Sequence, residues 1–262
     1  MRASHLLGIT ILLACQPVFA LDGRFSTTLG LDYSSGDYGA SQDTDVWAVP
    51  FSLKYRTDTW NIRASTSYLN VTSPNFVTPD GDFIGTGNAT ATKRVTEEGI
   101  GDINIAGTYN FLDERKYPVG LDVSAKIKIP TADEDKFLGT GKTDFGINTE
   151  IFQSFGDWSP YLNVGFKWRG DPKGFNLKNV WSSSIGTDYR INDSFNVGIG
   201  YDWQQKTTKF SDNAQEASAY VNYRVNDNNK VNFYVLGGFS IQPKLGFWLS
   251  VSSLLLIHCL II

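Results

Sequence analysis

The sequence predicts an all-β fold, a single antiparallel up-and-down transmembrane β-barrel of about twelve strands. Three observations predict this fold. Apolar and polar residues alternate with a period of two, long and short connections alternate, and the apolar faces often begin or end in Trp or Tyr. A strand with lipid on one side and water on the other alternates in this way, and aromatic rings suit the two membrane interfaces.

The alternation is clear in the first segment, where Phe25, Leu29, Leu31 and Tyr33 share one face and polar residues fill the other. By the same pattern we expect strands at 24–33, 47–55, 60–68, 102–111, 119–129, 143–153, 160–168, 180–190, 194–204, 215–225 and 230–238, and a twelfth from 245. The aromatic residues that end these apolar faces are Tyr33, Trp47, Tyr55, Trp60, Tyr68, Trp168, Tyr189 and Trp203.

The connections separate a barrel from a soluble β-sandwich, which has no reason to alternate their lengths. Short ones lie at 56–58, 112–116, 156–157, 192–193 and 226–229, and long ones near 34–44, 70–98, 130–142, 169–179, 204–214 and 239–244. Bacterial barrels have short periplasmic turns and longer outer loops. With the N-terminus in the periplasm, the first connection should be outer and long, as it is. The connection 70–98 is long and apolar enough to fold inward as a constriction.

The N-terminus predicts export. Residues 1–20 combine Arg2, a short apolar stretch and Val18-Phe19-Ala20, as in a secretory signal peptide cleaved after Ala20. Cys15 offers a second cleavage site, of the lipoprotein type. We expect residues 21–262 to form one domain, the barrel, located in the outer membrane of a Gram-negative cell.

The C-terminus departs from the pattern. Alternation holds from Leu245 to Val251 but is lost from Leu254, so residues 254–262 form an atypical apolar tail that ends in Ile262. Three interpretations remain open. The last strand continues into an unusual end, an apolar addition lies along the barrel, or the reading frame has shifted in the gene. Closure by 245–253 is therefore the least secure part of the predicted barrel.

Charged residues fall on the polar faces, and a Lys or Arg at the lipid midplane would cost about 2–4 kcal/mol. We therefore expect them to point inward. The candidate pore-lining residues are Lys54, Arg63, Asp102, Asp122, Lys126, Lys128, Glu150, Lys167, Arg169, Asp188 and Arg190, and Asp144, Asp202 and Arg224 share their side. They either line a water-filled pore or pair across a closed lumen. Lys126 and Lys128 are the best candidates for a local positive spot.

Catalytic chemistry finds little support. His258 is the only histidine after residue 20, so a histidine-based hydrolase is not expected. The segment 139–143 lacks the first glycine of a phosphate-binding loop, because Lys136 stands there. We interpret the acidic runs 133–135 and 80–82 as solvated loops, with calcium binding as the alternative. No enzymatic activity, cofactor, metal site or nucleic-acid partner is predicted, and the net charge of −4 gives no electrostatic case for nucleic acid.

Three short motifs resemble those of the outer-membrane channel family associated with the meta-pathway of phenol degradation. They are Gly99-Ile100-Gly101-Asp102 opening a strand, Lys128-Ile129-Pro130-Thr131-Ala132-Asp133 closing the next, and Gly139-Thr140-Gly141. The resemblance covers roughly 25–240; Ala132 replaces the usual glycine, and the C-terminus lacks the family's aromatic ending. It implies an outer-membrane channel, with aromatic or other apolar compounds as solutes in some members.

The predicted function is a passive channel for small, apolar or aromatic solutes. The alternative is a closed structural or surface-interaction barrel whose outer loops bind a partner or lipopolysaccharide. The expected partners are outer-membrane lipid and lipopolysaccharide, a small-molecule solute and the barrel-assembly machinery. The sequence leaves the oligomeric state open.

Overall fold

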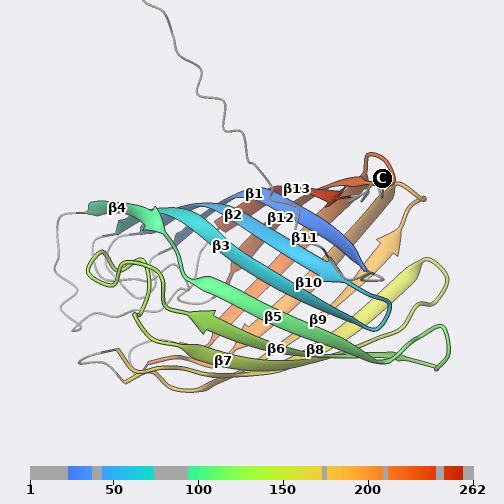
Figure 1. The fold of residues 1–262 in the computed structure, drawn as a ribbon, viewed down its shortest axis with the longest axis horizontal. Helices are drawn as coiled ribbons and strands as arrows, with labels where there is room; N and C mark the ends of the chain where they lie inside the picture. Colours follow the sequence, from blue (N-terminus) through green and yellow to red (C-terminus); the bar gives the residue numbers. More distant parts are fainter. Residues whose placement is uncertain are drawn as a thin grey trace, which may run out of the picture.

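The computed structural model describes residues 23–36, 43–73, 94–172, 176–208, 212–239 and 245–255. Within these ranges, no helix is long and apolar enough to cross a membrane. The described strands are β1 (Arg24–Gly36), β2 (Thr44–Arg56), β3 (Trp60–Ser73), β4 (Val95–Ile100), β5 (Ile103–Leu112), β6 (Gly120–Ile129), β7 (Asp144–Phe152), β8 (Trp158–Trp168), β9 (Val180–Arg190), β10 (Phe195–Gln204), β11 (Ala214–Arg224), β12 (Asn229–Gly238) and β13 (Leu245–Leu255) (Figure 1).

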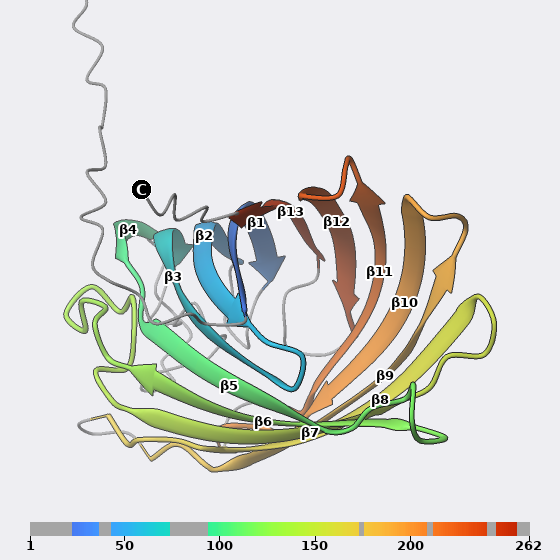
Figure 2. The same ribbon diagram turned by 45° about the vertical axis from the view of Figure 1, so that its right-hand side comes forward.

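The sheet closes on itself through its first and last strands. All consecutive strands except β4 and β5 pair antiparallel with one another, and β13 lies between β12 and β1 (Figure 2). The β1–β13 register runs from Ser35 opposite Leu245 to Phe25 opposite Leu255. The predicted closure by 245–253 is thus confirmed. The strand also continues through Leu254 and Leu255, which we had assigned to the tail; residues 256–262, like the predicted signal peptide 1–20, lie outside the described residues.

One position of the barrel wall is shared by two strands. The half of β3 nearer the outer end, from Tyr68 onward, pairs with β4, and Tyr68 lies opposite Ile100. The half nearer the periplasm, up to Ser65, pairs with β5, and Ser65 lies opposite Asn104. The break falls at Gly101, whose amide donates to the carbonyl of Ser67 at 2.8 Å. The barrel therefore has twelve positions, as predicted, and one extra strand that the sequence pattern placed inside the long connection 70–98.

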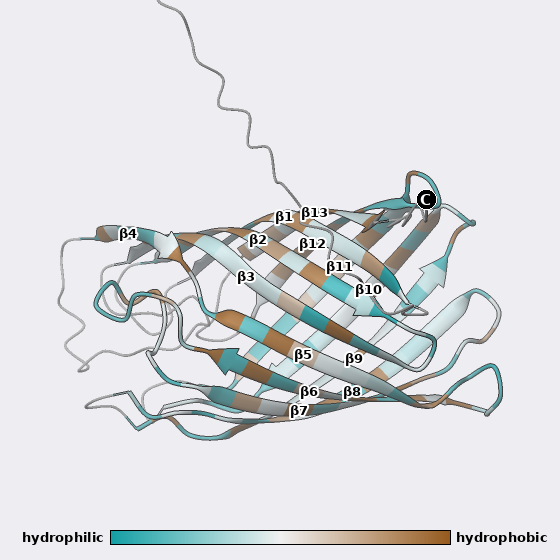
Figure 3. Ribbon diagram, viewed as in Figure 1, coloured by the Kyte–Doolittle hydropathy of each residue, from teal (hydrophilic) through white to brown (hydrophobic). Residues whose placement is uncertain are grey.

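The outer surface is apolar and ends in two bands of aromatic rings. Large outward side chains are highly exposed, for example Leu29 at 57% and Ile199 at 62%, as expected for a surface that lipid covers. Hydrophobic and hydrophilic residues alternate along many of the strands (Figure 3). Rings pair near the long connections, as in Tyr33 with Trp47 at 4.6 Å, and near the short turns, as in Trp158 with Tyr189 at 4.7 Å. These bands mark the two membrane interfaces. The end with the long connections is the outer end.

The inside of the outer end holds a small apolar core. Inward residues of β2 and β3, including Val46, Leu69 and Val71, pack with Leu138 from the β6–β7 loop, which is only 2% exposed. Phe137 precedes it in a left-handed conformation with φ 56°, which costs roughly 1 kcal/mol or more. The β6–β7 loop thus folds inward, which the sequence did not suggest. The segment expected to do so, 70–98, lies largely outside the described residues.

Candidate functional site

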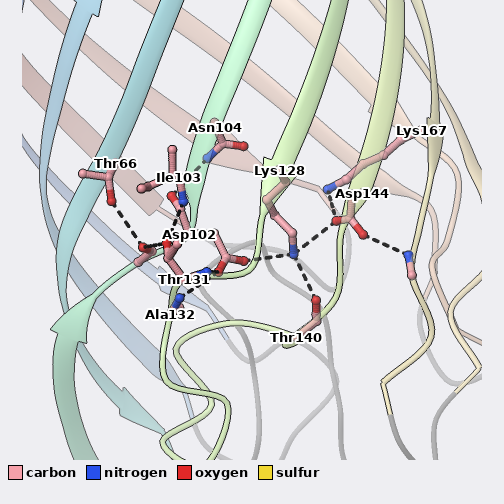
Figure 4. A network of polar contacts seen from close by, with 12 residues as sticks. Thr66, Asp102, Ile103, Asn104, Lys128, Thr131, Ala132, Thr140, Asp144 and Lys167 are labelled. Atoms are coloured by element: carbon pink, nitrogen blue, oxygen red, sulfur yellow. Dashed lines mark hydrogen bonds and ion pairs between the residues drawn. The ribbon is translucent and has the colours of Figure 1, made fainter.

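The three short motifs meet in one polar network at the outer end of the lumen (Figure 4). Lys128 on β6 is 4% exposed, and its Nζ lies 3.1 Å from Asp102 Oδ2 and 3.2 Å from Asp144 Oδ2. It also donates to Thr140 Oγ1 at 3.0 Å. Lys167 Nζ approaches Asp144 from β8 at 3.5 Å. A cation between two carboxylates compensates charges that would be costly to bury alone.

Asp102 and its neighbours tie the β6–β7 loop to the wall. The carboxylate Oδ1 of Asp102 accepts from the amides of Thr131 and Ala132 at 3.1 and 3.0 Å. A side chain on Gly139 would meet Ala132 Cβ at 2.8 Å and the Asp102 carboxylate at 2.9 Å, so only glycine fits there. Gly141 has φ 64° and supplies the turn. The loop is therefore built into the barrel by backbone and ion-pair contacts.

This network changes the interpretation of the predicted positive spot. Lys126 and Lys128 lie on the same inward face of β6, but Lys128 is buried between Asp102 and Asp144, whereas Lys126 is exposed. Lys128 is thus a structural cation of the outer end. The prediction that both lysines form a positive spot in a pore is wrong for Lys128.

An aromatic groove of about 410 Å³ lies further along the inner wall. Its rings come from Tyr220 on β11, Tyr234 on β12 and Trp248 on β13, which are direct cross-strand neighbours. The rings of Tyr234 and Trp248 are 5.3 Å apart. The remaining lining includes Leu236, Asp202, Glu216, Ser218, Asn222 and Asn232. The volume falls in the range of small-molecule sites, which are concave and largely apolar with a few polar groups.

Glycines opposite the tyrosines make room for these rings. A Cβ on Gly198 would meet the Tyr220 ring at 2.2 Å, and one on Gly186 would meet the Tyr161 hydroxyl at 2.5 Å. Small and large inward residues therefore alternate around this part of the wall, which is how small barrels fill a tapered interior. The arrangement places several aromatic rings, including the three of the groove, along the inner wall where the sequence pattern predicts polar groups.

The other end of the lumen opens into a polar cavity of about 820 Å³, which we call the periplasmic mouth. Three predicted residues line it: Lys54, Arg63 and Asp122. Other charged lining residues are Arg24, Arg56, Asp58, Asp113, Glu114, Arg115, Asp227 and Lys230. In the β5–β6 turn, hydrogen bonds from Arg115 lower the pKa of Asp113 to about 2.

The remaining predicted residues are spread along the lumen wall. Glu150 lies opposite Asp122 and accepts from Asn163 at 3.4 Å, and Asp188 and Arg190 lie near the periplasmic end of β9. Arg169 is buried at the outer end, where its amide donates to Asn179 Oδ1 at 2.9 Å. The eleven candidates therefore do not form one site. Asp102, Lys128 and Lys167 meet at the outer end, and Lys54, Arg63 and Asp122 meet at the mouth.

The aromatic groove was not predicted, because the predicted inward residues are all charged and the Trp and Tyr residues are assigned to the membrane interfaces. A usable signal existed. Tyr220 and Trp248 occupy positions whose neighbours two residues away are polar or glycine, and Tyr234 follows Asn232 on the same face. Near the acidic run 133–135, Asp133 Oδ1 accepts from the amides of Asp135 and Lys136, as in a loop turn.

A family model described as "Putative MetA-pathway of phenol degradation" matches residues 30–249. Among curated proteins, none matches the sequence. An outer membrane channel from Pseudomonas putida F1 is 15% identical over 92% of this chain and 97% of that chain, with a TM-score of 0.66. This likeness shows the outer-membrane barrel fold.

Two solved transporters are more distant. The Ralstonia pickettii toluene transporter TbuX is 12% identical over 90% of each chain, with a TM-score of 0.46. The Pseudomonas putida toluene transporter TodX is 11% identical over 89% of this chain and 88% of that chain, with a TM-score of 0.45.

Proposed function

Because the chain belongs to the family described by that model, and because its lumen holds an aromatic groove, we propose that it is a passive outer-membrane channel for small aromatic solutes. The groove is the observation that carries the proposal. Three adjacent rings and Leu236 offer an apolar surface beside the polar side chains that complete the groove. Aromatic pairs contribute about 0.5–1.5 kcal/mol beyond the area they bury, so such a wall favours an aromatic solute over an aliphatic one of equal size.

The groove also has a route to the periplasm. Asn232 lies at the periplasmic edge of the groove. Lys230, two residues away on the same face of β12, lines the mouth. Two residues of a strand span roughly 7 Å. A monoaromatic molecule leaving the groove therefore enters the mouth directly. An enzymatic role has no support in this arrangement, and the similar solved proteins are described as channels and transporters.

A closed barrel is the alternative, and the packed outer end favours it. The inward β6–β7 loop and the Lys128 network occupy part of the outer lumen. A barrel closed there would not pass solutes but would still be stable in the membrane. Binding in the groove and entry into cells separate the two functions.

Trp248 provides a test of binding. The other six tryptophans, Trp47, Trp60, Trp158, Trp168, Trp181 and Trp203, occupy outward strand positions. In bilayers of brominated lipid the outward rings should be quenched, and the emission that remains should disappear in Trp248→Phe. We expect neutral 4-nitrobenzyl alcohol to quench this remaining emission saturably, because its ring stacks in the groove. No quenching of this remaining emission, or quenching that rises linearly without saturation, would contradict groove binding.

A further inference from the structure

Four cations stand together at one corner of the periplasmic mouth. Arg24 on β1 lies directly opposite Arg56 on β2, and Lys54 on β2 lies directly opposite Arg63 on β3. All four line the same cavity of about 820 Å³. Like charges placed directly opposite one another on a sheet destabilise it. The corner is therefore an unfavourable arrangement for the empty barrel.

The carboxylates of the mouth do not neutralise this corner. Within the described residues, none of the four cations has a carboxylate oxygen within 4.0 Å. Asp113 is engaged by Arg115 at 2.7 Å, Glu114 accepts from the amide of Ser154 at 3.0 Å, and Asp122 accepts from Asn110 at 2.7 Å. Asp58 and Asp227 also line the cavity, from the β2–β3 and β11–β12 turns. Positive and negative groups thus share the mouth, but the four cations of this corner form no ion pair within the described residues.

We infer that this corner, Arg24, Lys54, Arg56 and Arg63, is an anion-binding site that receives the carboxylate of a small aromatic acid. The inference rests on the proposed function, since the aromatic acid reaches the mouth by way of the groove. A cavity wall of one sign concentrates counter-ions. The planar guanidinium group of arginine can donate two parallel hydrogen bonds to the two oxygens of a carboxylate. The mouth adjoins the groove through Asn232 and Lys230, so a solute can leave the rings with its carboxylate foremost.

The inference narrows the solute class. A neutral aromatic binds in the groove alone. An aromatic carboxylate that has left the groove binds a second time at the corner, which lies roughly 20 Å away because Trp248 is opposite Asp32 whereas Lys54 is opposite Ser26. The acidic pair Asp202 and Glu216 lies at the opposite, outer edge of the groove. An aromatic acid would therefore be repelled at the outer edge and attracted at the inner one, so its preferred position is shifted towards the periplasm.

The test compares two probes that differ in charge, 4-nitrobenzoate and 4-nitrobenzyl alcohol, by equilibrium dialysis against the refolded full chain. We expect wild type to bind the carboxylate about fivefold more tightly than the alcohol at low salt. Salt at 1 M, where the screening length is about 3 Å, should remove most of that preference. The double variant Lys54→Gln with Arg63→Gln should bring the ratio of the two affinities to about one.

The control removes the same charge elsewhere. Lys116 and Lys178 are exposed in loops, and Lys116→Gln with Lys178→Gln should leave the affinity ratio unchanged. The Lys54/Arg63 double variant should also unfold at higher denaturant concentration than wild type, because it relieves repulsion between opposed cations. A double variant that is more stable than wild type is correctly folded, so its loss of preference for the carboxylate probe would not result from misfolding.

The outcomes separate the two proposals. Equal affinities in wild type, or a preference that survives in the double variant, would overturn the anion site and leave the aromatic channel intact. Failure of both probes to bind the refolded chain saturably would overturn both, because neither the groove nor the corner would then hold a ligand.

Discussion

Replacing Lys128 with methionine should lower the free energy of unfolding by roughly 3 kcal/mol, among the largest effects expected of a single substitution in this barrel. The variant keeps most of the side-chain volume but leaves Asp102 and Asp144 facing one another at the buried outer end. Denaturant titration of the refolded barrel, followed by heat-modifiable migration on a gel, measures the change. Lys116→Met in the exposed β5–β6 turn is the matched control and should unfold like wild type.

A second substitution distinguishes lost charge from lost packing. Lys128→Met combined with Asp144→Asn removes the cation and one of the carboxylates it compensates. This double variant should recover part of the lost stability, because less uncompensated charge remains buried. A double variant less stable than Lys128→Met would contradict the account of Lys128 as a cation that holds two carboxylates.

Filling the aromatic groove should abolish most solute entry. Ser218 lines the groove from β11, and a bulky maleimide attached to Ser218→Cys would occupy much of its volume of about 410 Å³. We expect entry of a neutral nitroaromatic into Gram-negative cells that express the variant to fall roughly tenfold on labelling, since the site can hold little more than one small molecule. The experiment uses a Cys259→Ser background, so that the introduced thiol is the target.

The matched control places the same label on the outer face. Ser183 lies on β9 between outward neighbours, opposite Trp203 and Val164. Labelled Ser183→Cys should support the same entry rate as the unlabelled protein, because the label lies in lipid. Unchanged entry after labelling at Ser218 would show that solute does not pass through the groove.

The strands were predictable because successive side chains of a strand face opposite sides, so apolar and polar residues alternate along each segment of the wall. Lipid on one side and water on the other fix the outward set, so 47–55 lies within β2, and 194–204 begins one residue before β10 and ends with it. The break at Gly101 was not predictable, because β4 is short and its residues do not alternate between apolar and polar. Only the register on β3 shows that two strands share one neighbour.

The site was predictable only in part. The sequence pattern shows which face of a strand a charged residue occupies, but it does not show which residue that charge contacts. Lys126 and Lys128 have the same sign and the same face, yet cross-strand register places Lys128 opposite Asn104 and Asp144, while Lys126 meets Ala106 and Gly146. The approach of Asp102 and Thr140 depends further on a loop that folds inward around Leu138. These contacts depend on the path of the loop and on the strand register, neither of which can be read from composition or from the period of two.

The central claim, that the lumen passes small aromatic solutes, is tested most directly by entry of a neutral nitroaromatic into Gram-negative cells. The cells should lack their major porins and carry either the wild-type barrel or the Ser218→Cys barrel with its bulky label. The account predicts that wild type accelerates entry and that the labelled barrel, present in the outer membrane in equal amount, does not. Equal entry in both, at the rate of cells without the barrel, would contradict it and favour the closed barrel.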